Sequence, residues 1–429
     1  MWIEALVVLG KGNAFPRAMG SRSREDTSAT TKASQNASAR FNKRASILKC
    51  FPEEARDALP PQLSVCCLPT GIHRKPFHHM SLKKYYEAYN VILTDSTGNK
   101  TYGYCCTFFD ICLSKEERER TSEDDEFAYT KCLCLISKDP LYRTFEKLVR
   151  IIHDACFLER SVLECDYGLL TEIVTKVNCV PRLDTASPVH LILPLGGETV
   201  HLELGRVSGS LTSQTDVGDL LSMDPKVLVC LFESVLLERK VILRSNSMSK
   251  LTRVAEGICE LLQPLKWQHI YIPIVPEGLT EYLEAPTPYL MGVLSSISTQ
   301  NLSYDQSVEI DVDSSSCKFG SEFGLPFSED ILALRRRLEE DRPLQSMGRD
   351  FRFLFLETVL DLLDQSRVHF DRESDWEGLK ESGAKNAEFL QAFMETQMFQ
   401  NFSRHAGNVG SCRVQRHENR SEREALTNF

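Results

Sequence analysis

The 429-residue sequence lacks the patterns that mark most nucleotide-binding and hydrolytic enzymes. It has no Gly-x-x-x-x-Gly-Lys loop to hold phosphates, and Gly10 and Gly12 are not followed by the third glycine of a dinucleotide fingerprint. Ser208 stands one place away from the position that a nucleophile elbow requires, so a glycine turn is the better interpretation there. We therefore expect no catalytic residue and no phosphate-binding loop.

An excess of basic charge is also missing. Lys and Arg number 50 against 60 Asp and Glu, which gives a net charge of -10. Because nucleic-acid binders carry a basic field that neutralises phosphates, we expect no nucleic-acid partner. No apolar run approaches the roughly 18 residues of a transmembrane helix. The opening segment 1–9 is short, lacks a basic n-region and is interrupted by Glu4, so we expect no signal peptide and a cytoplasmic chain.

Metal-binding spacing is absent as well. The 15 cysteines include no Cys-x-x-Cys pair, which is the usual zinc spacing. Several lie close together inside apolar stretches, as Cys66-Cys67, Cys105-Cys106 and Cys132-x-Cys134. Three neighbouring histidines, His73, His78 and His79, stand in a polar stretch without matching acidic or thiol partners. The sequence thus favours buried reduced thiols and surface histidines, and we expect no metal and no cofactor.

The first part of the chain has the pattern of an antiparallel sheet. We expect strands over 3–9, 63–68 and 129–136, and a hairpin of 91–94 with 101–106 around a Gly-containing loop. Residues 12–46 are rich in Ser, Thr, Ala, Asn, Lys and Arg. That composition has little to bury, so we expect a disordered insertion.

After Pro140 the apolar period becomes helical, over about 141–152 and 160–177, before strands at 189–193 and 200–204. A helix at 225–237, a strand at 241–243, a helix at 251–262 and a strand at 270–275 then spell a βαβ unit, which predicts a parallel sheet covered by helices. Further strands are expected at 289–293 and 308–312. From about 326 the chain is helical, including 351–363 and 389–402, and ends in a polar tail.

The βαβ unit also carries a resemblance to a known family. Residues 236–243, 267–276 and 285–293 resemble, in order and spacing, the core module of DENN proteins. Phe51-Pro52, residues 68–72 and the hairpin through Tyr104 look like the upstream DENN segment, and 309–313 like the strand that closes the core. Residues 389–399 are similar to the last helix of the downstream segment. The resemblance covers about 1–9 and 47–403.

The resemblance implies an α/β fold of two lobes. The upstream segment, residues 1–136, would form a longin-like antiparallel sheet with helices. Residues 137–313 would form the core DENN domain with a mostly parallel sheet, 318–403 its helical downstream cover, and 404–429 a disordered tail. DENN proteins typically bind a Rab-type small GTPase between the lobes and release its nucleotide without covalent catalysis. The resemblance therefore implies such a partner and transient, peripheral recruitment to endomembranes.

Candidate contacts for the GTPase are aromatic and proline residues at strand ends, since hot spots favour such side chains. They are Trp267, Gln268, His269, Tyr271, Tyr282, Pro286, Pro288 and Tyr289. The alternative for these residues is that they hold the sheet to its helices; for Tyr102, Tyr104 and Phe108, core packing is the better interpretation. Two other functions stay open: a DENN-fold adaptor that binds a GTPase or trafficking complex without exchange, and, less favoured, a hydrolase.

Overall fold

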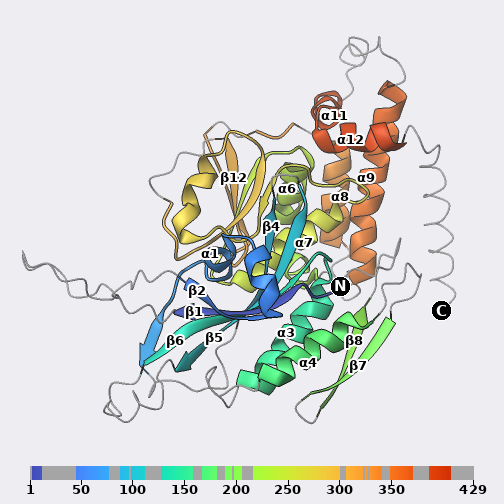
Figure 1. The fold of residues 1–429 in the computed structure, drawn as a ribbon. Helices are drawn as coiled ribbons and strands as arrows, with labels where there is room; N and C mark the ends of the chain where they lie inside the picture. The colour runs from blue at the N-terminus through green and yellow to red at the C-terminus, as the bar shows by residue number, and fades with distance from the viewer. Residues whose placement is uncertain are drawn as a thin grey trace, which may run out of the picture. The chain divides into compact units, whose positions relative to one another are not determined.

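A computed structural model gives the fold. It describes residues 2–11, 45–76, 87–95, 98–111, 127–157, 167–180, 189–195, 198–204, 216–299, 306–321, 324–326, 328–340, 348–370 and 386–406. Within it the chain forms two compact units (Figure 1). Unit 1 comprises Met1–Ser210 together with Ile274–Thr280, and unit 2 comprises Leu211–Pro273 together with Glu281–Phe429. The predicted tail at 404–429 falls almost entirely outside the described residues, as does the insertion from 12 to 44.

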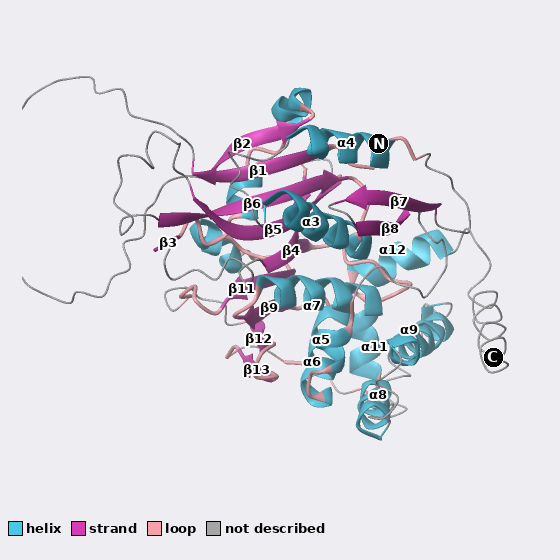
Figure 2. Ribbon diagram, turned by 90° about the horizontal axis from the view of Figure 1, so that it is seen from below, coloured by secondary structure: helices cyan, strands magenta, loops and turns pink. Residues whose placement is uncertain are grey.

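Unit 1 is built on an antiparallel sheet, as predicted (Figure 2). Its strands are β1 (Ala5–Lys11), β2 (Ala45–Phe51), β3 (Arg74–Pro76), β4 (Glu87–Thr94), β5 (Lys100–Ile111) and β6 (Phe127–Ser137). Their order is β2-β1-β6-β5-β4, and β3 pairs with β6. A separate hairpin joins β7 (Val189–Leu195) to β8 (Glu198–Leu204).

Helices α3 (Tyr142–Phe157) and α4 (Tyr167–Asn178) bury the apolar residues of one face of this sheet. The amino terminus is tied to the end of α4, where the side-chain oxygen of Asn178 accepts hydrogen bonds from the backbone N–H of Trp2 (2.9 Å) and Ile3 (2.8 Å). The indole of Trp2 donates to the carbonyl of Val180 at 2.9 Å. These hydrogen bonds fix the residues just before β1 to the end of α4, which lies far along the sequence.

Two expectations for unit 1 are wrong. Segment 63–68 is not a strand, because Leu63–Cys67 forms the helix α1. Leu63 and Cys67, one helical turn apart, are buried, whereas Val65 between them is 43% exposed; a strand would have placed all three on one face. The expected insertion over 12–46 also extends too far, because Ala45 and Ser46 already belong to β2. A short 3-10 helix, Glu53–Ala58, follows that strand.

Unit 2 contains the predicted, mostly parallel sheet. Its strands are β9 (Lys240–Ser245), β10 (Ile270–Ile272), β11 (Tyr289–Leu294), β12 (Ser307–Asp311) and β13 (Ser316–Phe319), in the order β10-β11-β9-β12-β13. All neighbours are parallel except β13, which runs antiparallel to β12. The central strand β9 is buried on both faces, which explains its continuous apolar run Val241, Ile242 and Leu243.

The helices of unit 2 are α5 (Gly218–Leu221), α6 (Pro225–Leu236), α7 (Met248–Leu261), α8 (Glu329–Glu340), α9 (Gly348–Phe370), α11 (Ala387–Met394) and α12 (Gln397–Ala406). A 3-10 segment, η5 (Glu277–Glu284), precedes β11. α6 packs on β9 and β12, α7 on β9 and β11, while α8 and α9 pack outside them. Among the described residues, no helix is both long and apolar enough to cross a lipid bilayer.

The helix expected at 389–402 is in fact two helices. α11 ends at Met394 and α12 begins at Gln397. The hydroxyl of Thr396 accepts a hydrogen bond from the backbone N–H of Phe399 at 3.2 Å, which caps the start of α12. Apolar periodicity continues through the break, so the pattern predicted one helix.

Candidate functional site

The predicted contact residues gather at one edge of the parallel sheet in unit 2. Trp267, Gln268 and His269 directly precede β10, and Pro286 and Pro288 precede β11. Since β10, β11 and β9 are parallel, the residues before them share the amino edge of the sheet. The argument that ligands gather at strand carboxyl ends therefore does not apply to them.

The exposure of these residues differs sharply. Gln268, Tyr282 and Pro286 are exposed, and Tyr282 keeps 45% of its surface. Trp267, His269, Tyr271 and Pro288 are half-buried. Tyr289 is fully buried, and its hydroxyl donates to the carbonyl of Leu283 at 2.9 Å, so it packs the sheet and offers no surface to a partner. A nearby residue that the sequence did not single out, Ile270, is 37% exposed.

A carboxylate ties this edge to the downstream helices. Glu238 lies in the tight turn between α6 and β9 with a positive φ of 51°. Its two oxygens accept hydrogen bonds from the backbone N–H groups of Gln397 and Met398, each at 2.8 Å, at the start of α12. A negative charge at a helix N-terminus is stabilised by the free N–H groups and the helix dipole.

The same carboxylate meets the predicted contact residues. The Nε2 atom of His269 lies 2.8 Å from a carboxylate oxygen of Glu238, and both side chains are largely buried. The rings of Trp267 and His269 contact each other edge to face, with centroids 5.4 Å apart. The indole N–H of Trp267 donates to the carbonyl of Ile270 at 3.2 Å. The half-buried side chains of Trp267 and His269, next to the exposed residues, are therefore held in place by these contacts.

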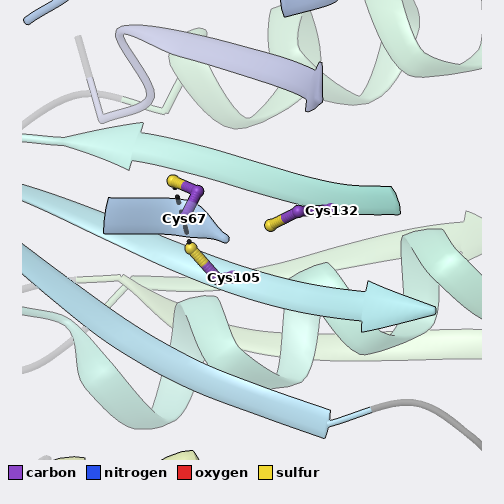
Figure 3. Close-up of side chains that lie close together, drawn as sticks. All are labelled: Cys67, Cys105 and Cys132. Atoms are coloured by element: carbon purple, nitrogen blue, oxygen red, sulfur yellow. Dashed lines mark hydrogen bonds between the residues drawn. The ribbon is translucent and has the colours of Figure 1, made fainter. Parts of the chain in front are cut away.

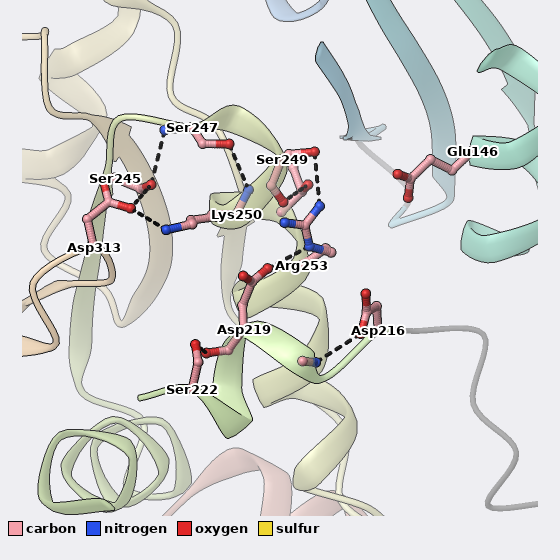
Figure 4. Close-up of polar contacts among 12 residues, drawn as sticks. Glu146, Asp216, Asp219, Ser222, Ser245, Ser247, Ser249, Lys250, Arg253 and Asp313 are labelled. Atoms are coloured by element: carbon pink, nitrogen blue, oxygen red, sulfur yellow. Dashed lines mark hydrogen bonds and ion pairs between the residues drawn. The ribbon is translucent and has the colours of Figure 1, made fainter. Parts of the chain in front are cut away.

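The carboxyl edge of the sheet carries a polar cluster whose members are not among the predicted site residues (Figure 4). Asp313, just after β12, accepts hydrogen bonds from the hydroxyl of Ser245 (3.1 Å), the backbone N–H of Asn246 (2.7 Å) and the ammonium of Lys250 (2.9 Å). Partial burial raises the pKa of Asp313, but these hydrogen bonds and the charge of Lys250 outweigh it and hold the pKa below the usual value. The carboxylate is thus ionised and bridges β9, β12 and α7.

A second ion pair continues this cluster. Arg253 on α7 donates to Asp219 at 2.6 Å and to the hydroxyl of Ser249 at 3.1 Å. Ser247 caps α7 by accepting from the backbone N–H of Lys250. The signal was present in the sequence: polar residues follow β9 and β12, and parallel neighbours end at one edge. The cluster braces α7 against β9, the end of β12 and α5.

Among the residues that the structure describes, one group of side chains is spaced to bind a metal ion, and it lies in unit 1 (Figure 3). The sulfurs of Cys67, Cys105 and Cys132 lie within 4.8 Å of one another, and all three residues are buried. Burial raises the pKa of Cys105 and of Cys132 well above the ordinary value. Cys-x-x-Cys spacing could not reveal this group, because its members come from one helix and two strands.

An antiparallel sheet with helices is joined in one chain to a mostly parallel sheet with a helical cover, and together they define a two-part α/β protein. The sequence matches two family models in order: the uDENN domain over residues 45–108 and the DENN (AEX-3) domain over residues 128–315. The chain belongs to the DENN family. This family consists of exchange factors rather than enzymes that make or break covalent bonds.

Curated relatives carry the same domain in their names. The chain is 30% identical over 281 residues to the DENN domain and WD repeat-containing protein SCD1 of Arabidopsis thaliana. This match covers 62% of this chain and 23% of the relative. It is 28% identical over 326 residues to DENN domain-containing protein 1B of Mus musculus (74% of this chain, 38% of the relative). It is 28% identical over 256 residues to DENN domain-containing protein 2A of Homo sapiens (57% of this chain, 22% of the relative). The chain thus spans well under half the length of these relatives.

Proposed function

We propose that this protein promotes the release of GDP from a Rab-type small GTPase. The observation that carries the proposal is the ordered match to the uDENN and DENN domains over 45–108 and 128–315, since the DENN family acts on Rab GTPases by exchange. The work is done by binding, and no residue is assigned a catalytic role. We further propose that the protein acts in the cytoplasm and is recruited peripherally to endomembranes, where Rab GTPases function.

The physical mechanism is a difference in affinity. A GTPase holds GDP through its phosphate-binding loop, Mg²⁺ and switch loops. A partner that binds the nucleotide-free form more tightly than the loaded form must weaken GDP binding by the same factor, because the two equilibria are linked. An acceleration of about 10⁴-fold requires roughly 5.5 kcal/mol of differential stabilisation. A few well-packed anchor residues in one interface can supply that much.

The exposed amino edge of the sheet in unit 2 supplies such anchors. Tyr282, Gln268, Pro286 and Ile270 combine exposed apolar and amide surface at positions that the hydrogen bonds of Trp267 and Tyr289 hold in place. Rigid side chains lose little conformational entropy on binding, which favours affinity. We propose that these four side chains contact the GTPase and that Tyr289, His269 and Glu238 support them from below.

Release of a fluorescent GDP analogue from a panel of purified Rab GTPases tests the proposal. The full chain at micromolar concentration should accelerate release from at least one of them, in proportion to its concentration. The GTPase that responds should also form a stable complex with the chain when nucleotide is removed by a chelator, and excess GDP should dissolve that complex. No acceleration across the whole panel would refute exchange.

Surface variants then locate the contact. Tyr282→Ala should slow exchange about 10- to 30-fold, as expected for loss of one anchor side chain. The matched control is Phe319→Ala, since Phe319 is also an exposed aromatic residue (55%) but lies on β13, at the opposite end of the same sheet. Equal losses in the two variants would contradict a contact at the amino edge.

The second candidate function is an adaptor that grips a GTPase or a trafficking complex without exchange. The firm packing of Trp267, His269 and Glu238 suits a rigid docking surface as well as an exchange factor. Equal affinity for the GDP-loaded and nucleotide-free GTPase, without accelerated release, would favour the adaptor. The nucleotide dependence of binding therefore separates the two functions.

A further inference from the structure

The strongest unexplained feature is a row of cysteines on one face of the antiparallel sheet in unit 1. Strand pairing sets Tyr89 of β4 opposite Cys105 of β5, and Cys105 opposite Cys134 of β6. Because side chains alternate along a strand, Cys132 points to the same face as Cys134. Cys106 points to the other face, into the core beneath α3 and α4.

A further cysteine reaches this face from outside the sheet. Cys67 is the last residue of α1, and its sulfur lies 3.5 Å from that of Cys105 (Figure 3). The hydroxyl of Tyr89 donates to the carbonyl of Cys67 at 2.5 Å and fixes the end of the helix over the sheet. The pairing of Cys105 with Cys134 places the Cys134 side chain on this face as well. Three thiols from three elements therefore lie within 4.8 Å of one another, and Cys134 stands beside them on the same face of the sheet.

The spacing matches a thiolate metal site. Zinc binds thiolate sulfur at about 2.3 Å in a tetrahedron, so two sulfurs on one zinc ion lie about 3.8 Å apart. The sulfurs of Cys67 and Cys105 already stand at 3.5 Å, and that of Cys132 lies within 4.8 Å of both. All four cysteines are at most 1% exposed, as in the closed sites that hold structural zinc.

We propose that Cys67, Cys105, Cys132 and Cys134 form a structural site for a thiophilic divalent cation such as Zn²⁺. Each thiol that becomes a ligand loses its proton to solvent, so the binding of one Zn²⁺ by four thiols releases up to four protons and changes no oxidation state. The hydrogen bond from Tyr89 to Cys67 positions the backbone that carries one ligand, as supporting residues of metal sites do.

The site would fix a short helix to the sheet. α1 has only five residues and no side-chain cap, so its own hydrogen bonds stabilise it little. The segment that follows it, through Pro69, accepts a hydrogen bond from the backbone N–H of Glu277 at 2.8 Å. A metal that holds Cys67 against β5 and β6 would thereby order the surface that α1 and this segment form in unit 1.

Metal content and cobalt spectroscopy of the full chain test the inference. Purified under reducing conditions and passed over a chelating resin, the chain should retain about one equivalent of zinc per molecule, measured by mass spectrometry of the elements. Replacement of zinc by Co²⁺ should give the intense thiolate-to-cobalt charge-transfer absorption and the visible bands of a tetrahedral, sulfur-rich site. Both measurements use the wild-type chain, so they do not depend on a variant that folds.

The variant Cys132→Ser should lower the zinc content at least about fivefold, because it removes one ligand. The matched control is Cys106→Ser, which changes an equally buried neighbour of Cys105 on the opposite face and should keep the metal. A folded, reduced wild-type chain that holds less than about one tenth of an equivalent of zinc and shows no cobalt charge-transfer band overturns the inference. A disulfide between Cys67 and Cys105 in the native chain, found by mass spectrometry, overturns it as well.

Discussion

The cap that Glu238 places on α12 can be tested by removing its carboxylate. Glu238→Ala leaves the backbone N–H groups of Gln397 and Met398 without the two 2.8 Å hydrogen bonds that they now make. Hydrogen bonds to charged groups contribute about 1.5 to 3 kcal/mol each, and water compensates part of the loss. We therefore expect local opening of α12 to become easier by about 3 kcal/mol, which corresponds to roughly 150-fold in the opening equilibrium.

Hydrogen exchange followed by mass spectrometry measures this directly. Peptides that cover Gln397–Ala406 should exchange roughly 100 times faster in Glu238→Ala than in the wild type, while peptides from β9 and β11 should keep their protection. Glu238→Gln should fall between the two, because its amide offers one acceptor oxygen in place of two. Glu238→Gly removes the same hydrogen bonds but suits the positive φ of 51°, so it should recover about 1 kcal/mol relative to alanine in global stability.

Glu395→Ala is the matched control, since Glu395 is an exposed acid one residue before Thr396 and makes its side-chain hydrogen bond with Gln391. In Glu395→Ala, the rate of hydrogen exchange in α12 should stay within about threefold of the wild-type rate. If Glu238→Ala also leaves the exchange of Gln397–Ala406 unchanged, the carboxylate does not hold the helix, and the account of this edge is refuted.

Three further changes should alter stability in defined ways. Burial raises the pKa of Glu233 to about 7, above the ordinary 4.5, so the folded chain binds this proton more tightly than the unfolded chain and its stability falls as pH rises between these values. Glu233→Gln should therefore stabilise the protein by about 2 to 3 kcal/mol at pH 8 and by less than about 1 kcal/mol at pH 5, measured by urea denaturation. Asp313 has a lowered pKa, so its contribution is present above the unfolded value of 3.8 and is lost as pH falls through the folded value. Asp313→Asn should lower the melting temperature at pH 7 and match the wild type once the pH is well below 3.8; an equal deficit at both would contradict the ionic role. A Cβ atom at Gly292 would stand 1.9 Å from the carbonyl oxygen of Pro273, so Gly292→Ala should cost about 3 kcal/mol or more in denaturation, whereas Gly278→Ala, with open space around it, should cost little.

Most of the fold could be predicted because its elements carry strong local patterns. β9 and α7 are a continuous apolar run and an amphipathic helix, and they appear close to the expected positions. The hairpin of β4 and β5 follows from two β-rich runs around a glycine turn. The family resemblance extended these patterns to the order of the whole chain, and the domain matches over 45–108 and 128–315 confirm the family.

The errors arise where the context outside a segment decides its structure. The segment 63–68 has five apolar residues out of six, a short run that fits either a strand or a helix, and the exposure of Val65 distinguishes the two. The break between α11 and α12 depends on Glu238, which lies about 160 positions earlier in the chain. Antiparallel β13 has two half-buried and two exposed residues, so its sequence shows too little apolar periodicity to predict a strand.

The candidate site shows the same division. Chain order alone predicts that Trp267 and Pro286 lie at a common edge of a parallel sheet. It does not predict that Tyr289 beside them is fully buried. The cysteine cluster could be predicted only in part. Alternation along β6 puts Cys132 and Cys134 on one face, whereas the arrival of Cys67 requires knowing that its segment is a helix.

Unit 1 takes Ile274–Thr280 from a stretch of chain that lies more than sixty positions beyond its main segment, which ends at Ser210. Ile274 and Val275 in that stretch are almost completely buried. A gene fragment that stops at residue 210 would expose the surface these two side chains normally cover and would be prone to self-association. To study unit 1 by itself, one should therefore use a permuted or split chain that includes Ile274–Thr280, rather than a simple truncation at residue 210.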